Sequence, residues 1–389
     1  MSQRLSEKDL LLDVSRLVWR VWRGALPTGI DRVCLAYLSH YRERALAVLQ
    51  RKGAHVVLPA AQSDRLFDIL LGRGDQARRN LVKAALTSLP WLRASPPRKG
   101  MCYINVGHTG LDEPSLPKWI ERHDTRAIFM VHDLIPITHP GFCRPGEADK
   151  HRQRMSNLLR SATGVIANSR ATLDDLAHFA EEEGQALPTS VVAWLGVDRF
   201  APNDLRPTRL DVPHFVTIGT IEGRKNHLLL LRIWRRLAER LGPETPKLVI
   251  IGQRGWEAKQ VFEQLDALGP LQQHVVELGR CSDAQLAGYL AGAEALLMPS
   301  FAEGFGLPVV EALRLGTHVV ASDLPALREI GGTGATYLDP LADAEWEEEV
   351  ARLTISARSP AGVVRPPTGY RAPDWQSHFD IVDAWLDTL

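Results

Sequence analysis

Short apolar runs alternate with longer segments of helical periodicity along the whole chain. In the first half, the runs that predict strands are residues 10–14, 54–58, 101–106, 127–132, 164–168 and 190–194. A second set begins at His214 and comprises HFVTIG, KLVIIG, HVVELG, ALLMPS and HVVAS. Such short β-branched runs between helical segments are typical of parallel sheets covered by helices.

The two sets are separated by a proline-rich break at residues 198–213, so we predict an α/β protein with two doubly wound, Rossmann-like domains. The domains predicted are residues 1–210 and 211–372, followed by a C-terminal helix in residues 373–389 that can cross back to the first domain. Because ligands of open α/β sheets bind at the carboxyl ends of the strands, we expect a ligand in a cleft between the two domains.

The charge of the chain is zero overall but unevenly distributed. Among 389 residues there are 46 Lys and Arg and 46 Asp and Glu. Residues 1–210 hold 30 basic and 22 acidic side chains, whereas residues 211–389 hold 16 and 24. This balance argues against a nucleic-acid binder. Four scattered cysteines without a C-x-x-C pair and no long apolar run favour a reducing, cytoplasmic location.

A pair of cations follows the first strand of the second half, in GTIEGRKNHLLLL. Arg224 and Lys225 lie between the strand and the start of a helix near His227. Adjacent cations and a helix N-terminus are suited to a diphosphate. A solvated basic turn is the alternative for this pair alone.

Two glutamates separated by seven residues follow the ALLM strand, in PSFAEGFGLPVVEALRLG. If a helix begins near Leu307, Gly304 and Gly306 permit close approach of a ligand to free N–H groups. Glu303 would precede that helix, and Glu311 would lie about one turn into it. A carboxylate, glycines at a helix start and a second carboxylate suit a nucleotide sugar.

At this point the sequence resembles the retaining family 4 glycosyltransferases of the GT-B architecture. The stretch from Glu303 to Glu311, the RKN stretch, IIGQRGW and SDAQLAGYLAGAEALLMPS match in the expected order. The first half matches more loosely through PTGIDRV, VHDLIPITHP, GVIANSRAT and LGVDRF. The resemblance implies that residues 1–210 bind the acceptor and residues 211–372 the nucleotide sugar.

The resemblance also implies roles for individual residues. Lys225 and Arg224 would hold the donor diphosphate, Glu303 would lie near the hydroxyls of the transferred sugar, and Glu311 would bind the ribose. The backbone of Gly304, Phe305, Gly306 and Leu307 would meet the phosphates or the sugar. In some members an arginine follows the glycine that ends the first strand of this domain, and Thr220 stands there, so Arg254 is a candidate to help.

The chemistry of the reaction agrees with these roles. Negative charge grows on the leaving β-phosphate during sugar transfer, and preorganised cations and amides stabilise it. The chain has no D-x-D pair for a metal, so we expect no metal and no cofactor beyond the nucleotide-sugar substrate.

Candidates in the first half are weaker. Gly29, at a turn that enters a helix, would lie near the donor, and His108 follows a predicted strand. His132 and Asp133 directly follow another. The resemblance places His132 near the donor sugar and the acceptor, as a catalytic residue, while Asp133 and His108 are acceptor-side candidates. Structural alternatives are a core role for His132 and local hydrogen bonding for His108.

Two basic stretches could meet a membrane surface. SRLVWRVWRG interleaves arginines with Trp19 and Trp22, and residues 76–93 place Arg78, Arg79 and Lys83 away from an apolar helical face. Basic amphipathic segments bind anionic lipid headgroups. Ordinary core faces with solvated charges explain them equally well.

Together these features predict a retaining, metal-independent hexosyltransferase that acts on a glycan or lipid-linked acceptor in lipopolysaccharide or other polysaccharide synthesis, in the cytoplasm or at the inner face of the membrane. HDLIPI and GQRGW look most like mannosyl- and rhamnosyltransferases, which favours GDP-mannose or a GDP-deoxyhexose. The alternatives are a sugar-nucleotide 2-epimerase of related fold, which needs no acceptor, and a non-catalytic nucleotide-sugar-binding subunit.

Overall fold

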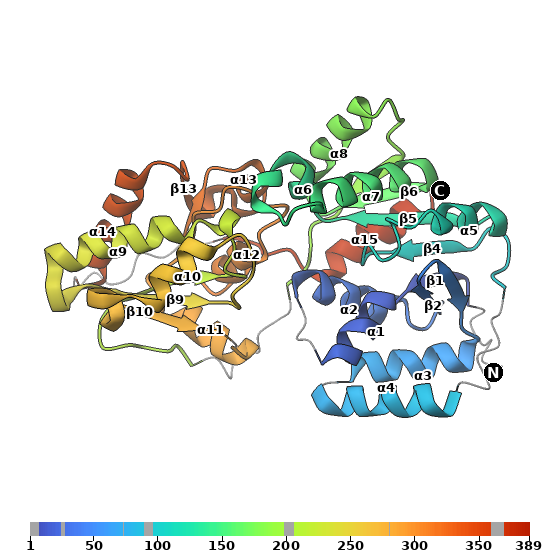
Figure 1. Ribbon diagram of the computed structural model, residues 1–389, viewed down its shortest axis with the longest axis horizontal. Coiled ribbons are helices and arrows are strands. Elements are labelled where there is room, and N and C mark those ends of the chain that lie inside the picture. The colour runs from blue at the N-terminus through green and yellow to red at the C-terminus, as the bar shows by residue number, and fades with distance from the viewer. Residues whose placement is uncertain are drawn as a thin grey trace. The chain divides into compact units, whose positions relative to one another are not determined.

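The computed structural model describes residues 8–24, 28–72, 74–88, 96–197, 206–279, 281–358 and 369–389. The chain forms two compact units (Figure 1). Unit 1 comprises Met1–Leu134, Asp149–Leu195 and Trp375–Leu389, and unit 2 comprises Ile135–Ala148 and Gly196–Asp374. Residues 198–205 of the expected linker lie outside the described residues.

Unit 1 is built on a seven-stranded sheet in the order β3-β2-β1-β4-β5-β6-β7. Its strands are β1 (Leu10–Asp13), β2 (Ala45–Arg51), β3 (Ala54–Val57), β4 (Cys102–Asn105), β5 (Arg126–Val131), β6 (Gly164–Ala167) and β7 (Thr189–Val192). All pairs are parallel except β2 with β3. Central strands such as β1, β4 and β6 are buried along their whole length, as expected when helices cover both faces.

The helices of unit 1 begin at identifiable local signals. They are α1 (Ser15–Arg23), α2 (Gly29–Tyr41), α3 (Ala60–Leu71), α4 (Gly74–Ser88), α5 (Ser115–His123), α7 (Glu147–Ser161) and α8 (Arg170–Glu182), with α7 crossing the boundary between the units. Thr28 and Asp31 form a capping box at α2, and Ser169 accepts a hydrogen bond from the Thr172 N–H at α8. Each cap satisfies backbone donors that the first turn leaves without an intrahelical partner.

The C-terminal helix α15 (Trp375–Leu386) belongs to unit 1. Tyr37 in α2 hydrogen-bonds His378 over 2.9 Å, and the other ring nitrogen of His378 lies 2.9 Å from the Trp194 carbonyl oxygen. Phe379 is buried and stacks on a histidine of α2. Ile381 of the same helix is 44 % exposed and lies off this buried face, although an apolar face of the C-terminal helix that included Ile381 was expected from the sequence.

Unit 2 is built on a parallel six-stranded sheet in the order β10-β9-β8-β11-β12-β13. Its strands are β8 (His214–Ile218), β9 (Lys247–Ile251), β10 (Val275–Leu278), β11 (Ala295–Met298), β12 (His318–Ser322) and β13 (Ala335–Leu338). Its helices are α6 (Ile135–Thr138), α9 (His227–Leu241), α10 (Lys259–Asp266), α11 (Asp283–Gly292), α12 (Leu307–Arg314), α13 (Pro325–Gly331) and α14 (Asp343–Arg358).

One core cluster in unit 2 joins the sheet to α9 and α14. Trp234 and Trp346 are fully buried in it, beside Phe215 of β8. Each indole N–H donates to a backbone carbonyl, that of Pro246 over 2.7 Å and that of Asp339 over 2.9 Å. Satisfying these donors removes the cost of burying them, so the two tryptophans stabilise the packing of both helices.

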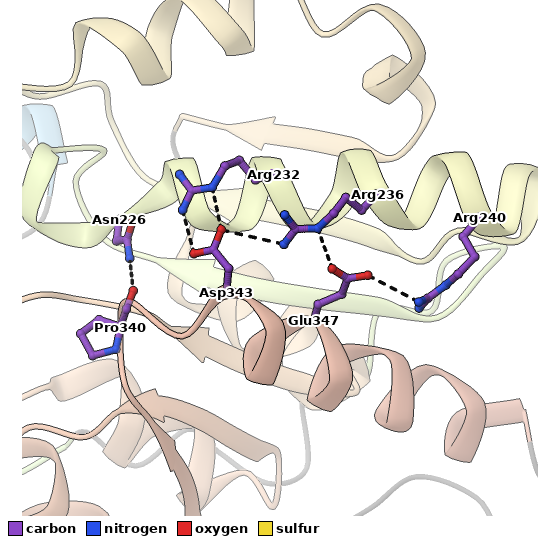
Figure 2. Close-up of polar contacts among 7 residues, drawn as sticks. All are labelled: Asn226, Arg232, Arg236, Arg240, Pro340, Asp343 and Glu347. Carbon is purple, nitrogen blue, oxygen red and sulfur yellow. Dashed lines mark hydrogen bonds and ion pairs between the residues drawn. The ribbon is translucent and has the colours of Figure 1, made fainter.

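The polar side of α9 is held to α14 by a ladder of ion pairs (Figure 2). Asp343 accepts two hydrogen bonds of 2.9 Å from Arg232, and Glu347 accepts one of 2.6 Å from Arg236. Arg240 continues the ladder to Glu347 at 3.4 Å. The arginines recur every four residues because that spacing keeps side chains on one helical face.

Every strand predicted from an apolar run is confirmed to within one or two residues, but β2 and β13 were not predicted. No helix among the described ranges is both long and apolar enough to cross a membrane.

Candidate functional site

The cation pair of unit 2 lies in a tight turn at the carboxyl end of β8. Gly223–Lys225 form one 3₁₀ turn, and Asn226 follows in the left-handed region with φ of 53°. A Cβ at Gly223 would lie 2.6 Å from the Glu257 carbonyl oxygen, so the close approach of that backbone requires glycine. The turn therefore directs Arg224 and Lys225 from the strand end.

Glu303 receives both cations. Its carboxylate pairs with the Lys225 ammonium and lies 3.0 Å from Nη1 of Arg224, and it accepts a 2.7 Å hydrogen bond from the Ser300 hydroxyl. The Glu303 side chain is only 7 % exposed. A carboxylate offers roughly four lone-pair positions, so about one remains for a further donor such as a sugar hydroxyl.

A second carboxylate, Glu222, completes the cluster. Glu222 Oε1 lies 2.6 Å from Nε of Arg224, and Nη1 of the same guanidinium donates to the Ala302 carbonyl oxygen over 2.8 Å. Glu222 is 3 % exposed. Two glutamates and Lys225 thus lie buried beside the half-buried Arg224, and we refer to Glu222, Arg224, Lys225 and Glu303 as the ion cluster.

The pKa values in the ion cluster follow from burial and charge. Burial raises the pKa of Glu303, but the Lys225 and Arg224 charges outweigh it and lower the pKa to about 2. Burial lowers the pKa of Lys225, against the opposing charge of Glu303. For Glu222 burial prevails over the same cations and raises the pKa. Glu303 is therefore firmly ionised, whereas Glu222 ionises less readily.

The loop after Glu303 leads into α12 through glycine. Gly306 is the N-cap residue of α12 with φ of 98°, and a Cβ there would lie 2.5 Å from a methyl group of Leu327. The helix begins at Leu307, as predicted. Pro308 has no N–H and the Val309 N–H donates to the Gly306 carbonyl oxygen over 2.9 Å, so in this turn the Leu307 N–H is the group without an intrahelical acceptor. Glu311 lies in the same helix and is buried, with 5 % exposure.

Arg254 does not join the ion cluster. Its guanidinium makes two 2.8 Å hydrogen bonds to Glu277 and lies 2.7 Å from Asp266, and these hydrogen bonds raise its pKa. The expectation that Arg254 helps to hold the diphosphate gains no support from this geometry, because both edges of the guanidinium already face carboxylates.

Part of the first half of the sequence packs in unit 2. Phe142 stacks on Phe301 with centroids 5.2 Å apart and planes 3° from parallel. Arg144 lies over the Trp256 ring at 5.0 Å. Phe301 precedes Glu303 by two residues, and its N–H donates to the Arg224 carbonyl oxygen over 2.8 Å. The segment Ile135–Ala148 therefore supports the loops that carry the ion cluster.

In unit 1, two histidines lie side by side at the carboxyl ends of β4 and β5. His132 Nε2 lies 2.7 Å from the Val106 carbonyl oxygen, and His108 Nε2 lies 2.7 Å from that of Met130. Their ring centroids are 5.1 Å apart. Because a carbonyl oxygen only accepts, Nε2 carries the proton in each ring. Burial lowers both pKa values, so both rings are neutral and Nδ1 of each is an acceptor.

Of the other two predicted residues of unit 1, Asp133 directly follows His132, whereas Gly29 lies far from both histidines in the sequence. The Asp133 carbonyl oxygen lies 3.2 Å from Nε2 of His151, whose ring is 6.1 Å from His108. Gly29 is the first residue of α2. The structure brings His108 and His132 together, and Gly29 is not part of that pair.

A buried polar network adjoins the carboxyl end of β1 in unit 1. Asp13, 5 % exposed, accepts hydrogen bonds from Gln50 over 2.6 Å and from the Tyr103 hydroxyl over 3.1 Å. Asn105 donates to the same hydroxyl over 3.1 Å. Burial raises the pKa of Asp13 to about 6, because these donors are neutral and compensate only in part.

The sequence of residues 206–356 matches the family described as Glycosyl transferases group 1. These residues are a glycosyl transferases group 1 domain. The O-antigen chain mannosyltransferase B of Escherichia coli is 38 % identical over 222 residues, which are 55 % of this chain and 58 % of that protein. The serotype-specific mannosyltransferase WbdA of Escherichia coli is 29 % identical over 234 residues, 56 % of this chain and 28 % of that protein. The chain thus matches between a quarter and three fifths of the length of these two relatives.

A solved structure, that of Anabaena Alr3699/HepE in complex with UDP and glucose, has a TM-score of 0.66 at 17 % identity, covering 98 % of this chain and 100 % of the other. Together with the two parallel-sheet units, this similarity shows the GT-B fold.

The glycosyl transferases group 1 domain contains the whole ion cluster. The sequence pattern predicted Glu303 as a site residue but did not predict Glu222. Glu303 belongs to a motif, but nothing in the sequence marks Glu222, whose only signal is its place two residues before Arg224. The sequence also did not predict the buried polar network of Asp13 in unit 1, because the hydrogen-bond partners of Asp13 are 37 and 90 residues away. Among the described ranges no group of three or more His, Cys, Asp or Glu side chains could hold a metal ion.

Proposed function

We propose that the protein is a retaining hexosyltransferase that moves mannose or a deoxyhexose from a GDP-sugar to a glycan or lipid-linked acceptor in surface polysaccharide synthesis. The observation that carries this proposal is the buried ion cluster at the carboxyl end of β8. Ionised Glu303 keeps Lys225 and Arg224 charged and fixed in a site where little water screens them. The names of the two mannosyltransferase relatives support the donor class.

In this reaction the bond between the sugar C1 and the β-phosphate oxygen breaks while the acceptor oxygen bonds to C1 on the same face. The acceptor proton passes to the departing phosphate oxygen, and the nucleoside diphosphate leaves. Lys225 and Arg224 would stabilise the charge that grows on the diphosphate, together with the Leu307 N–H at the start of α12. Preorganised donors of this kind typically contribute about 10²- to 10³-fold each to the rate.

The remaining side chains have distinct tasks in this scheme. Glu303 would orient sugar hydroxyls with its remaining lone pair, and Glu311 would bind the ribose. In unit 1, the neutral His132 offers Nδ1 as an acceptor for a hydroxyl of the donor sugar or the acceptor. Catalysis in this account needs no metal, because the cations of the ion cluster act on the diphosphate themselves.

The experiment is a panel of GDP-, UDP- and ADP-sugars incubated with a lipid-linked oligosaccharide, with nucleotide release and product anomer followed by NMR. We expect release from a GDP-sugar only when the acceptor is present, and an α-linkage from an α-donor. Release or epimerisation without an acceptor would indicate an epimerase instead. Binding of donor without turnover, over all acceptors, would leave a non-catalytic subunit.

We further propose that α4 lies against the cytoplasmic leaflet. Arg78, Arg79 and Lys83 are exposed on it, whereas Leu81 is buried; Leu89 and Arg93 of this stretch lie outside the described residues. The other basic stretch is less suited, because Arg16 and Arg20 pair with buried Asp31 at 2.7 and 2.9 Å. Each cation near anionic headgroups contributes about 1 kcal/mol.

Vesicle co-sedimentation tests this surface. Wild-type protein should sediment with anionic vesicles and not with neutral ones, and changing Arg78, Arg79 and Lys83 to Glu should abolish sedimentation. Equal sedimentation of that variant, or indifference to lipid charge, would contradict the proposed surface.

A further inference from the structure

The loop that follows β4 holds His108 in an uncommon backbone conformation. His108 has φ of 58°, in the left-handed region that residues with a side chain rarely adopt. Its ring is half-buried, and Nε2 is bonded to the Met130 carbonyl oxygen over 2.7 Å. Nδ1 has no hydrogen-bond partner among the described residues and keeps accessible surface. The loop therefore presents one open acceptor, on a ring 5.1 Å from that of His132.

The Asn105 side chain is hydrogen-bonded to the backbone on both sides of His108. Its Oδ1 accepts from the Gly107 N–H over 3.2 Å, and its Nδ2 donates to the Thr109 carbonyl oxygen over 2.9 Å. Asn105 is fully buried, so water does not compete for either bond. The two bonds need an acceptor and a donor on one side chain, which an amide provides.

Asp13 sets the direction of the Asn105 amide through Tyr103. Above its pKa of about 6, Asp13 is a carboxylate that only accepts, so the Tyr103 hydroxyl donates to it over 3.1 Å. The lone pairs of that hydroxyl then accept from Asn105 Nδ2 over 3.1 Å and from Gln50 Nε2 over 2.7 Å. With Nδ2 fixed on this side, Oδ1 of Asn105 must face the opposite N–H.

Gln50 supports the end of the same loop from β2. Its Nε2 lies 2.6 Å from Asp13 Oδ2 and 3.2 Å from the Thr109 carbonyl oxygen. A Cβ at Gly110, where φ is 72°, would lie 2.0 Å from Gln50 Oε1, so the amide packs directly on the backbone there. Side chains of β1, β2 and β4 thus converge on the loop of residues 106–110.

We propose that this buried polar network, through Asn105, holds His108 so that its Nδ1 accepts a hydrogen bond from a hydroxyl of the sugar acceptor. Asp13, Tyr103 and Asn105 are then positioning residues, and His108 binds the acceptor. The identity of the ligand rests on the proposed transferase function, whereas the positioning does not. Burial lowers the pKa of His108 well below 6.5, so the ring stays neutral and Nδ1 remains an acceptor at neutral pH.

Transfer kinetics test the acceptor role, with the GDP-sugar and the lipid-linked oligosaccharide that the wild type uses. Tyr103→Phe removes the hydroxyl between Asp13 and Asn105, and it should raise KM for the acceptor about three- to tenfold, the effect of one neutral hydrogen bond. The donor KM and kcat should not change.

A double-variant cycle tests whether Tyr103 acts through His108. His108→Asn, which keeps a residue that tolerates left-handed backbone, should raise the acceptor KM at least as much as Tyr103→Phe. The two changes together should be no worse than His108→Asn alone. Additive losses, or a change confined to kcat or to the donor KM, would overturn the acceptor role.

Nitrogen-15 NMR of histidine-labelled protein tests the positioning without any transfer reaction. Loss of its signals in His108→Asn assigns the ring. In the wild type at pH 8 we expect one tautomer, with the proton on Nε2, and a ring that is still neutral at pH 6. In Asn105→Ala and Tyr103→Phe we expect mixed tautomers and protonation at higher pH, because the ring no longer keeps its bond to Met130.

Ser63→Ala is the matched control, because the Ser63 hydroxyl is another fully buried group of unit 1 that is bonded to two backbone groups. It should lower the unfolding temperature without changing the acceptor KM or the His108 spectrum. An unchanged His108 tautomer and pKa in both Asn105→Ala and Tyr103→Phe would overturn the positioning. Absence of transfer by the wild type would instead overturn the proposed function, and the acceptor role with it, while the spectra still decide the positioning.

Discussion

Two buried carboxylates at strand ends, Asp13 in unit 1 and Glu303 in unit 2, have opposite electrostatic surroundings. Asp13 accepts hydrogen bonds from neutral groups only, and burial raises its pKa to about 6. Glu303 is equally enclosed, yet two cations lower its pKa to about 2. Unit 2 has therefore concentrated charge where a diphosphate would bind, whereas the strand ends of unit 1 present neutral histidines and hydrogen-bonding groups suited to hydroxyls.

The largest effect is expected from Lys225→Met, which removes one of the two cations that pair with Glu303. Transfer should fall by about 10²- to 10³-fold. The free energy of unfolding should fall by about 3 kcal/mol, because Glu303 loses one partner inside the protein. The measurements are initial transfer rates and urea unfolding.

The double variant Lys225→Met with Glu303→Gln is the control. It should recover most of the lost stability, since no buried charge is left without its partner, and none of the activity. If Lys225→Met alone keeps full transfer activity, the ion cluster does not contribute to catalysis.

Asp13 and Glu303 should affect the pH dependence of the free energy of unfolding in opposite ways. The pKa of Asp13 rises from 3.8 to about 6 on folding, so its ionised form costs about 3 kcal/mol above pH 6, and this cost disappears as the pH falls to 3.8. The lowered pKa of Glu303 stabilises the fold above pH 4.5, and this stabilisation is lost only as the pH falls from 4.5 toward 2.

Urea unfolding between pH 7 and pH 4.5 measures both effects. Relative to Asp13→Asn, the wild type should gain stability as the pH falls through this range, by a large part of the 3 kcal/mol. Relative to Glu303→Gln, it should show no trend over the same range. A flat difference for Asp13→Asn would show that Asp13 is ionised in the folded protein at low pH.

A smaller effect is expected from Glu222→Gln, which removes the charge that holds Nε of Arg224. A hydrogen bond to a charged group contributes about 1.5 to 3 kcal/mol, so kcat/KM should fall about ten- to a hundredfold. If Glu222 acts through Arg224, adding Glu222→Gln to Arg224→Gln should change little. Additive losses would mean that Glu222 works independently, and Glu239→Gln on the exposed face of α9 is the control.

The smallest effect concerns the surface ladder between α9 and α14 (Figure 2). Arg236→Gln should lower the free energy of unfolding by less than about 1 kcal/mol and leave transfer unchanged, because exposed ion pairs are screened by water. Thermal unfolding in low and high salt measures it. A loss as large as that of Lys225→Met would show that burial does not distinguish the two sets of ion pairs.

The strands were predictable where apolar runs are short and buried on both faces, and less so elsewhere. The run ALAVLQR of β2 consists largely of residues with good helix propensity, so local preference indicated a helix and the sheet prevailed. The four residues of β13 are only half-buried at the sheet edge, which leaves a weak pattern. Both β2 and β13 therefore form because they pair with neighbouring strands of the sheet, and not because of local sequence preference.

Candidate site residues were predictable where a motif holds them close in sequence. Arg224, Lys225 and Glu303 meet because two strand ends carry them to one edge. Arg254 was a candidate because Thr220 stands where some members of the family have an arginine, but its partners Glu277 and Asp266 come from β10 and α10 and could not be inferred from spacing. Asp13 and Gln50 pair through the alignment of adjacent strands, which a single sequence does not specify.

The most direct test of the charged site is calorimetric titration of GDP into the wild type and into the stable Lys225→Met, Glu303→Gln double variant. We expect measurable binding by the wild type and a loss of at least tenfold in affinity for the double variant. Equal affinity of the two proteins would contradict the assignment of the ion cluster to the donor diphosphate.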